Sequence, residues 1–324
     1  MEIHQLRYFV VVADERNFSR AAEKVHVAQP SLSQQIQKLE AELGQPLFDR
    51  LPRTVLLTEA GKRFRECAQR VLADVADAQR CIDEFKGEAV GNLMIGAIPT
   101  IAPYLLPRLL PPFQQKHPKV TVEVVEDVTE SLERRLDDGE VDLALLSTCE
   151  SGDLSLDPLG EEPLLVAVPA GHRLTERKRV TWRDLKRERF LTLHRAHCLS
   201  RQVEELCSAQ GLRPELAARG AQLITIVRMV RAGLGLSLVP QMMADDEGNK
   251  GCSFLPFVAP APTRPLNIAH NPMRFQSKAA LAFTGTAVTC FAPTRVGQVP
   301  EPVLHSYRRQ EKKRAASCKN CERR

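Results

Sequence analysis

The stretch from residue 28 to residue 40 reads AQPSLSQQIQKLE, and it decides the fold of the N-terminal part of the chain. Leu32, Ile36, Leu39 and Leu43 recur at helical spacing, so they predict a helix with one apolar face. Pro30 suits the first turn of such a helix, where its missing N–H is not needed. We therefore expect a helix whose apolar face is turned toward the core of a small domain.

Two shorter helical patterns precede this helix, and two short strands follow it. Apolar residues repeat at helical spacing over residues 6–13 and 18–25, and Asn17 can cap the second of these helices. Residues 48–50 and 55–57 read as strands on either side of Pro52. Three helices followed by a two-stranded wing predict a winged helix-turn-helix DNA-binding domain over residues 1–58.

The opposite face of the residue 28–40 helix is polar and suits the reading of DNA. A helix fits the major groove, where glutamine can pair with adenine, and hydroxyls in its first turn suit phosphate. The expected DNA contacts are Gln29, Pro30, Ser31, Ser33, Gln34, Gln35 and Lys38 on the helix, and Arg50 and Arg53 on the wing. For any single one of these residues, a solvated polar surface is the alternative interpretation.

Bulk charge does not support DNA binding, although the formal net charge is +5. Residues 295–324 hold nine Lys/Arg and three Asp/Glu, whereas residues 1–60 hold seven Lys/Arg and eight Asp/Glu. The excess belongs to a Pro-rich and then basic segment, residues 292–324, which we expect to be a flexible tail. The prediction of DNA binding therefore rests on the pattern of residues.

A long helix is predicted after the wing, over residues 59–88. It starts at Thr58 and Glu59 and contains no proline or glycine between Lys62 and Lys86. Its apolar residues alternate spacings of four and three, which is typical of a coiled-coil seam. The expected dimer contacts are Phe64, Ala68, Val71, Val75, Ala78, Ile82 and Phe85. An amphipathic helix that packs on its own domain is the alternative.

Past Gly87, strand-like runs alternate with helical ones. The strand-like runs are residues 93–97, 120–125, 141–146, 164–168, 190–193, 236–239 and 266–269. This alternation predicts an α/β fold with mostly parallel strands. The chain is expected to leave one lobe near Pro158 and to return near Asn267, giving a two-lobed sensor over residues 91–291. Lobe I would be residues 91–160 and 267–291, and lobe II would be residues 161–266.

Residues 6–61, including AQPSLSQQIQKLE and the helix start LTEAG, resemble the LysR-type transcription regulators. The resemblance continues through both lobes to about residue 291. It implies a winged helix-turn-helix, a linker helix that forms the dimer interface, and a periplasmic-binding-protein-like sensor. Such regulators usually act as homotetramers on two adjacent half-sites. Double-stranded DNA and further copies of the chain are therefore the implied partners, with RNA polymerase as an additional candidate.

Two threonines are expected at the cleft between the lobes. Thr100 follows a strand in IPTIAPYLLP, and Thr129 holds a similar position after the strand at 120–125. A hydroxyl together with free N–H groups at a helix start can hold a carboxylate or an oxyanion. A simple helix cap without a ligand is equally compatible with the sequence.

Cys198 and Cys207, in HCLSRQVEELC, lie nine residues apart in an expected helix. Nine residues turn roughly 900° and rise ~13 Å, whereas a disulfide needs Cα atoms within ~7 Å of each other. The two thiols can therefore bond only if the helix unwinds, which is a physical basis for a redox switch. Nearby His197, Arg195 and Arg201 offer positive or proton-accepting groups that favour a thiolate at Cys198. Inert buried cysteines are the alternative.

The HCL motif, its distance from the second cysteine, the IPTIAPYLLP stretch and Thr129 resemble the peroxide sensors of the OxyR type within the LysR family. By this resemblance Cys198 is the peroxidatic thiol and Cys207 is the resolving thiol. His197, Thr100 and Thr129 would then surround the peroxide.

Two positions depart from the pattern of that group. Ser200 stands where an arginine is usual, and Asn271 stands where a pocket arginine is expected. Each departure removes a positive charge that would stabilise the thiolate of the reactive cysteine.

The remaining cysteines and the chain's start indicate the compartment. Nine scattered cysteines do not resemble a secreted disulfide framework, and neither a signal peptide nor a membrane span is apparent, so a cytoplasmic location is expected. Cys318 and Cys321 form a lone CxxC, whereas a zinc site usually needs four ligands. We expect no metal site and no cofactor.

Three functions are compatible with these patterns. The first is a DNA-binding activator that responds to hydrogen peroxide through Cys198 and Cys207, in an oxidative stress response. The second is a LysR-type regulator of metabolism that binds a small anionic metabolite between Thr100 and Thr129. The third is a thiol peroxidase, which has no need of a helix-turn-helix. Because no nucleotide loop or nucleophile elbow is present in the sequence either, we expect the chain not to be an enzyme.

Overall fold

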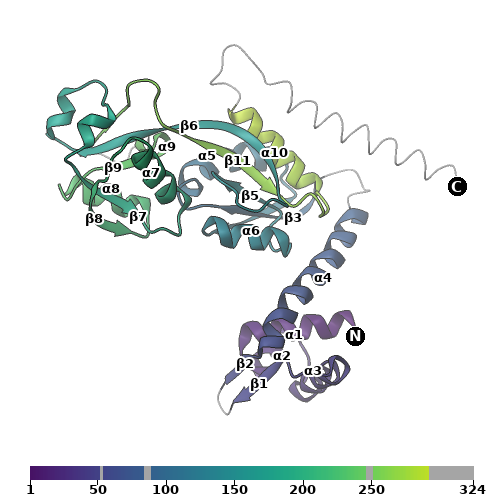
Figure 1. Cartoon of the computed structure of the whole chain (residues 1–324). Coiled ribbons are helices and arrows are strands. Elements are labelled where there is room, and N and C mark those ends of the chain that lie inside the picture. Colours follow the sequence, from purple (N-terminus) through teal and green to yellow (C-terminus); the bar gives the residue numbers. More distant parts are fainter. Residues whose placement is uncertain (52–53, 84–88, 246–250, 292–324) are drawn as a thin grey trace.

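The computed structural model describes residues 1–51, 54–83, 89–245 and 251–291 of the chain. A small helical domain lies at one end of a long helix, and an elongated α/β sensor lies at the other (Figure 1). Among the described residues, no helix is both long enough and apolar enough to cross a membrane.

The N-terminal domain is the predicted winged helix-turn-helix. Its elements are α1 (Ile3–Glu15), α2 (Phe18–Lys24), α3 (Gln29–Leu43) and the antiparallel strands β1 (Phe48–Leu51) and β2 (Thr54–Leu57). The fully buried Phe9 lies at its centre, with ring centroids 5.2 Å from Phe48 and 5.0 Å from Phe64. Leu32 and Ile36 bring the apolar face of α3 into the same core, as their spacing predicts.

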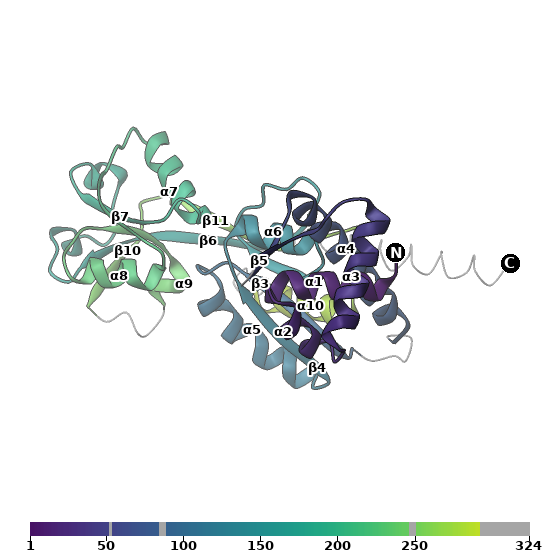
Figure 2. The ribbon, with the colours of Figure 1, turned by 90° about the horizontal axis from the view of Figure 1, so that it is seen from below.

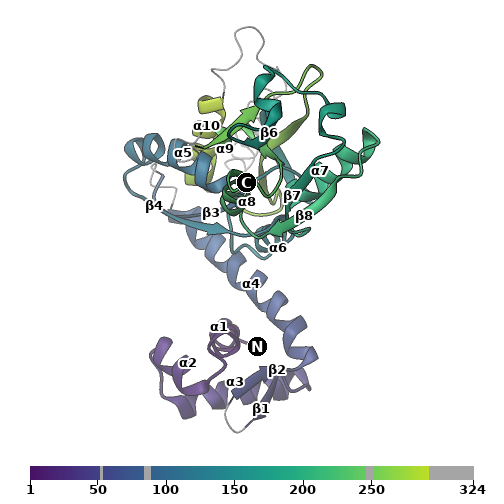
Figure 3. The same cartoon turned by 90° about the vertical axis from the view of Figure 1, so that its left-hand side faces the viewer.

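Helix α4 (Glu59–Asp83) begins at the expected residue and connects the N-terminal domain to the sensor (Figure 3). Thr58 caps it, because its hydroxyl accepts a hydrogen bond of 2.9 Å from the Gly61 amide. A Cβ atom at Gly61 would lie 2.1 Å from the carbonyl oxygen of Leu47, so a glycine is required there. This close approach brings the first turn of α4 against the backbone at Leu47.

Lobe I of the sensor is built on three parallel strands. Strand β3 lies between β4 and β5 and pairs with both in parallel. The elements of this lobe are β3 (Gly91–Ala97), α5 (Ala102–Lys116), β4 (Val120–Glu126), α6 (Thr129–Asp137), β5 (Leu143–Leu146) and α10 (Lys278–Phe291). Phe113 of α5 and Phe283 of α10, both fully buried, meet at a ring distance of 5.4 Å in its core.

Lobe II has a separate apolar core of its own. Its strands are β7 (Arg189–Leu193), β8 (Glu215–Gly220), β9 (Ser237–Pro240) and β10 (Cys252–Leu255). Its helices are α7 (Cys198–Ala209), α8 (Leu223–Arg231), α9 (Gln241–Ala244) and the 3-10 helices η2 (Arg173–Glu176) and η3 (Trp182–Leu185).

Two long antiparallel strands, β6 (Ser155–Pro169) and β11 (Thr263–His270), run side by side between the lobes (Figure 2). Pro158 and Asn267, where the chain is predicted to leave and re-enter lobe I, are directly paired across these strands. The expectation of mostly parallel strands past Gly87 is wrong, since four of the seven strand pairings described in that part of the chain are antiparallel. Strand β6 takes part in three of these antiparallel pairings, with β9, β10 and β11, and β11 also runs against β5.

Candidate functional site

The polar face of α3 is turned away from the core of its domain. The predicted DNA contacts that are exposed on it are Gln29, Pro30, Ser31, Gln34 and Lys38, while Ser33 is half-buried. Gln35 differs, because it is half-buried and its Oε1 accepts a 3.1 Å hydrogen bond from Nε2 of the buried Gln5. Helix α1 therefore fixes the orientation of the Gln35 amide.

Of the two arginines predicted on the wing, Arg50 lies in β1 opposite Val55. The side chain of Arg50 and the whole of Arg53 fall outside the described residues. Their contacts with DNA stay a prediction.

The predicted dimer seam on α4 divides into two parts. Ala68 is only 1% exposed and Phe64 packs on Phe9, so both belong to the core of their own domain. The prediction that Ala68 contacts a second copy is therefore wrong. The later members of the seam form an exposed apolar face, made of Val71, Val75, Ala78 and Ile82. Phe85 lies outside the described residues.

The two thiols of the predicted redox pair lie on one continuous helix, α7. Cys198 is its first residue, and Cys207 lies two residues before its end. Each is 3% exposed, but Cys198 packs with the core of lobe I whereas Cys207 packs with that of lobe II. Burial raises the pKa of Cys207 to about 11, and the Glu204 carboxylate adds to the shift. Both thiols are free, and the intact helix holds them apart.

The arginines predicted to surround Cys198 are engaged with acidic side chains. Arg201 forms an ion pair with Glu150 of lobe I. Arg195, which precedes α7, lies 3.6 Å from the carboxylate of Glu204. Glu204 is one turn beyond Arg201 on α7. These contacts direct both arginines to carboxylates, and the Arg201 pair also ties α7 to lobe I.

His197 and Ser200 flank the start of α7. Burial lowers the pKa of His197, while a hydrogen bond to the Ala221 backbone acts in the opposite direction. The neutral imidazole is thus favoured. The Ser200 hydroxyl donates to the Leu193 carbonyl over 2.9 Å and lies 3.3 Å from the Thr192 hydroxyl. These two contacts join α7 to β7.

Thr100 is held by a buried arginine that the sequence analysis missed. Arg264 is fully buried and donates from Nη1 to the Thr100 hydroxyl over 2.9 Å and from Nη2 to its carbonyl over 3.0 Å. Its Nε donates to Glu162 over 2.7 Å, and Glu162 also accepts from the Met242 amide over 2.7 Å. The period-two pattern of β11 could have shown it, because Arg264 shares a face with the buried Leu266.

Thr129 and Gln202 carry buried polar atoms without a partner among the described residues. These atoms are Oγ1 of Thr129 and Oε1 of Gln202. The Nε2 atom of Gln202 donates to the Ser147 hydroxyl over 3.0 Å, which joins α7 to the end of β5. Thr100, Thr129 and Ser147 follow the parallel strands β3, β4 and β5, so all three lie at the same edge of the sheet. Buried polar atoms are usually paired in proteins, so these two atoms are available to a water molecule or a polar ligand.

Asn271 is not part of this group, which corrects the expectation that it replaces a pocket arginine. Its Nδ2 donates to Asp137 over 3.2 Å, and it lines a small cavity with Arg80 and Arg274, next to α4. The arginine that contacts Thr100 is Arg264.

Both halves of the chain match known protein families. Residues 3–62 match the family described as "Bacterial regulatory helix-turn-helix protein, lysR family", and residues 86–289 match "LysR substrate binding domain". The chain is 38% identical over 275 residues to the hydrogen peroxide-inducible genes activator of Dickeya chrysanthemi, covering 84% of this chain and 90% of that protein.

Two solved structures resemble the whole molecule. One is full-length OxyR from Pseudomonas aeruginosa with a cysteine replaced by aspartate, at 31% identity and a TM-score of 0.76, covering 93% of this chain and 99% of that one. The other is a cysteine mutant of Corynebacterium glutamicum OxyR with H₂O₂ bound, at 29% identity and a TM-score of 0.59, covering 92% and 97%.

Proposed function

This chain belongs to the LysR family of bacterial helix-turn-helix regulators, and we propose that it is a transcription activator that hydrogen peroxide switches through Cys198 and Cys207. The observation that carries the proposal is the placement of these two thiols on one helix, each buried in the core of a different lobe. A bond between them requires α7 to unwind and both cores to repack. Formation of one disulfide bond would thereby change the structure of both lobes.

The proposed chemistry has two steps that balance. The Cys198 thiolate attacks one oxygen of H₂O₂, the O–O bond breaks, and a sulfenic acid and hydroxide form. The Cys207 thiolate then attacks the Cys198 sulfur, the S–O bond breaks, and the disulfide forms as the oxygen leaves as water after taking up a proton. The peroxide is reduced and the two thiols are oxidised, with no cofactor needed.

The hydrogen-bonding groups at the sheet edge favour peroxide over an anionic metabolite. The Thr100 oxygen already accepts from Arg264, so its proton is free to be donated to a ligand. The unpaired Oε1 of Gln202 can only accept. Hydrogen peroxide both donates and accepts, whereas a carboxylate only accepts and would leave Oε1 unpaired.

The N-terminal domain and α4 are proposed to carry out DNA binding and assembly. The exposed polar face of α3 is proposed to read operator bases in the major groove, with the wing on the phosphate backbone. Val71, Val75, Ala78 and Ile82 are proposed to pair two copies in a homodimer, and two dimers to form a homotetramer on adjacent half-sites.

The domain limits, location and remaining roles follow the same proposal. We assign DNA binding to residues 1–58, the linker to residues 59–88 and peroxide sensing to residues 91–291. The predicted tail, residues 292–324 with Cys318 and Cys321, lies outside the described residues. The protein acts in the cytoplasm as a regulator without enzymatic turnover, with RNA polymerase as a further partner.

The test is DNA binding before and after peroxide, on DNA that the protein itself selects from a random pool. Peroxide should change the footprint of the unmodified protein and leave that of Cys198→Ser unchanged. Cys290→Ser, which removes an exposed thiol on α10, is the matched control and should respond normally. A Cys198→Ser protein that still responds to peroxide would overturn the proposal.

A further inference from the structure

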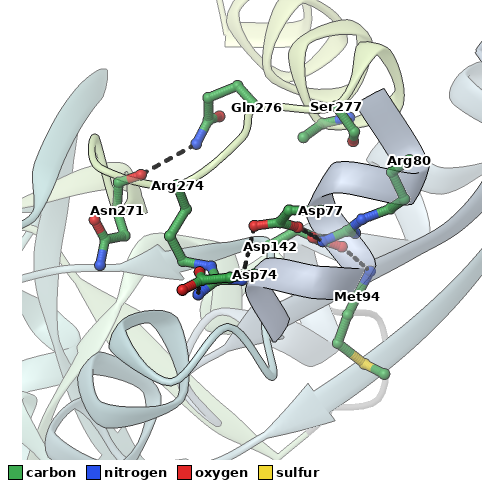
Figure 4. Close-up of polar contacts among 10 residues, drawn as sticks. Asp74, Asp77, Arg80, Met94, Asp142, Asn271, Arg274, Gln276 and Ser277 are labelled. Atoms are coloured by element: carbon green, nitrogen blue, oxygen red, sulfur yellow. Dashed lines mark hydrogen bonds and ion pairs between the residues drawn. The ribbon is translucent and has the colours of Figure 1, made fainter. Parts of the chain in front are cut away.

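Lobe I contacts the linker helix α4 through a network of charged side chains, shown in Figure 4. Arg80 of α4 donates to Asp142 of lobe I over 2.6 Å and also pairs with Asp77 on its own helix. From the lobe, Arg274 donates to Asp77 over 2.7 Å. We call Asp77, Arg80, Asp142 and Arg274 the linker network.

Most of the linker network is shielded from solvent, and only Arg80 is as much as 30% exposed. The side chains of Asp77, Asp142 and Arg274 are only 9%, 11% and 12% exposed. At Gly139, where φ is +71°, a Cβ atom would lie 2.3 Å from Cζ of Arg274 and 2.7 Å from the Ala73 side chain of α4. Buried ion pairs of this kind are costly to break and favour one discrete arrangement.

One connection runs from the redox helix to the linker network through β5. Gln202 of α7 donates to Ser147, the residue that follows the last residue of this four-residue strand. Asp142, the residue that precedes the strand, accepts from Arg80 and, through Oδ2, from the Met94 amide over 2.8 Å. The two contacts therefore lie at opposite ends of one short, fully buried strand.

A second connection runs through α6. Arg201 of α7 pairs with Glu150, whose amide donates over 2.7 Å to Glu133 on α6. One turn further along α6, Asp137 accepts from Asn271 over 3.2 Å. The Asn271 carbonyl in turn accepts from the Arg274 amide over 3.2 Å and from Nε2 of Gln276 over 3.4 Å, the second of which is drawn in Figure 4. These two hydrogen bonds order the turn that presents Arg274 to α4.

We propose that the linker network is where the redox state of α7 is passed to the DNA-binding half of the chain. Unwinding of α7 removes its contacts with Ser147 and Glu150, the ends of β5 and α6 shift, and α4 is released from lobe I. This inference rests on the proposed function. A change in the angle between α4 and the lobe alters the spacing of the two DNA-reading domains in a dimer.

Hydrogen exchange of the full chain, followed by mass spectrometry of peptides from residues 69–83, measures release of α4 directly. The double variant Arg201→Ala/Gln202→Ala breaks both contacts of α7 without any oxidation. It should exchange these α4 amides at least about fivefold faster, the lower end of usual coupling between sites. Asp77→Asn, which opens the network itself, should have the same effect. Arg189→Ala removes an exposed pair with Glu215 inside lobe II and should change nothing in α4.

Equal α4 exchange in Arg201→Ala/Gln202→Ala and in the unmodified protein would overturn the inference. If the double variant does not fold, Ser147→Ala/Glu150→Ala removes the two lobe I groups that α7 contacts and leaves α7 itself unchanged, and unchanged α4 exchange there would overturn the inference equally. These variants need no peroxide, so failure of the redox chemistry, measured by mapping the disulfide, is told apart from failure of the coupling.

Discussion

Arg264 and Glu162 face each other across the paired strands β11 and β6, with Nε donating to Oε2 over 2.7 Å and both side chains buried. Through Arg264 the pair holds Thr100 of lobe I, and through the second carboxylate oxygen it holds Met242 of α9. The pair therefore ties the two lobes together at the proposed peroxide site.

Removing the charge of Glu162 should destabilise the protein strongly. Glu162→Gln leaves the buried Arg264 without its counter-ion, which typically costs roughly 3–5 kcal/mol of unfolding free energy. Urea unfolding measures this loss. Glu161→Gln, whose exposed carboxylate accepts from Thr263, is the control and should stay within about 0.5 kcal/mol of the unmodified protein. Similar losses for both variants would show that the buried pair contributes little.

Thr100→Val should slow the oxidation of Cys198 by peroxide about tenfold, because one hydrogen bond to the reacting peroxide is lost. The rate constant comes from stopped-flow mixing followed by alkylation of the remaining thiol. Reaction with diamide, which needs no hydroxyl donor, should change little. Equal slowing with both oxidants would indicate that the substitution perturbs access to Cys198 rather than binding of peroxide.

The closing of the disulfide should accelerate with pH, because only the Cys207 thiolate attacks the sulfenic acid. Burial raises the pKa of Cys207 from its ordinary value of 9.0 to about 11 while α7 is intact. If the helix opens first, the exposed thiol titrates closer to 9.0, so the apparent pKa of closure should lie well below 11. Rapid quenching at a series of pH values measures it. A midpoint near 11 would mean that Cys207 attacks from the intact helix.

Gln34→Ala should weaken binding to selected operator DNA by ~1–3 kcal/mol, the usual worth of a glutamine–adenine contact. Fluorescence anisotropy at fixed salt measures the affinity. Gln115→Ala makes the same change on an exposed position of α5 and serves as the control. Unaltered affinity of Gln34→Ala would count against α3 as the reading helix.

Val75→Asp should shift the protein toward monomer, since it places a charge in the exposed apolar face of α4. Light scattering across a concentration series measures the mass. Val258 is similarly exposed, at 48% against 39%, but lies in lobe II, so Val258→Asp should keep the assembly intact. A Val75→Asp protein of unchanged mass would refute pairing through α4.

The spacing of residues close together in the sequence was sufficient to predict the helices of the N-terminal domain and their buried faces. The spacing of Leu32, Ile36 and Leu39 indicates both the helix and its buried face, because each turn of a helix repeats the same surface. The prediction of the dimer seam on α4 was only partly correct. Ala68 has the right spacing for a dimer contact, but it is buried in the core of its own domain, where α1 packs against α4.

Contacts between segments far apart in the sequence could not be predicted in the same way. Arg264 and Glu162 are 102 residues apart, and Arg274 and Asp77 are 197 apart, so only the folded chain brings each pair together. The antiparallel return of β11 and the polar strand β8 also lack a local signature, since pairing direction is set by tertiary structure.

The most direct test of the redox switch is to identify which thiols are bonded after the reduced protein meets micromolar hydrogen peroxide. Free thiols are alkylated, the protein is digested without reductant, and the peptides are identified by mass. The account predicts one new linked peptide pair that joins Cys198 to Cys207. Recovery of both cysteines in the alkylated form after peroxide would contradict it.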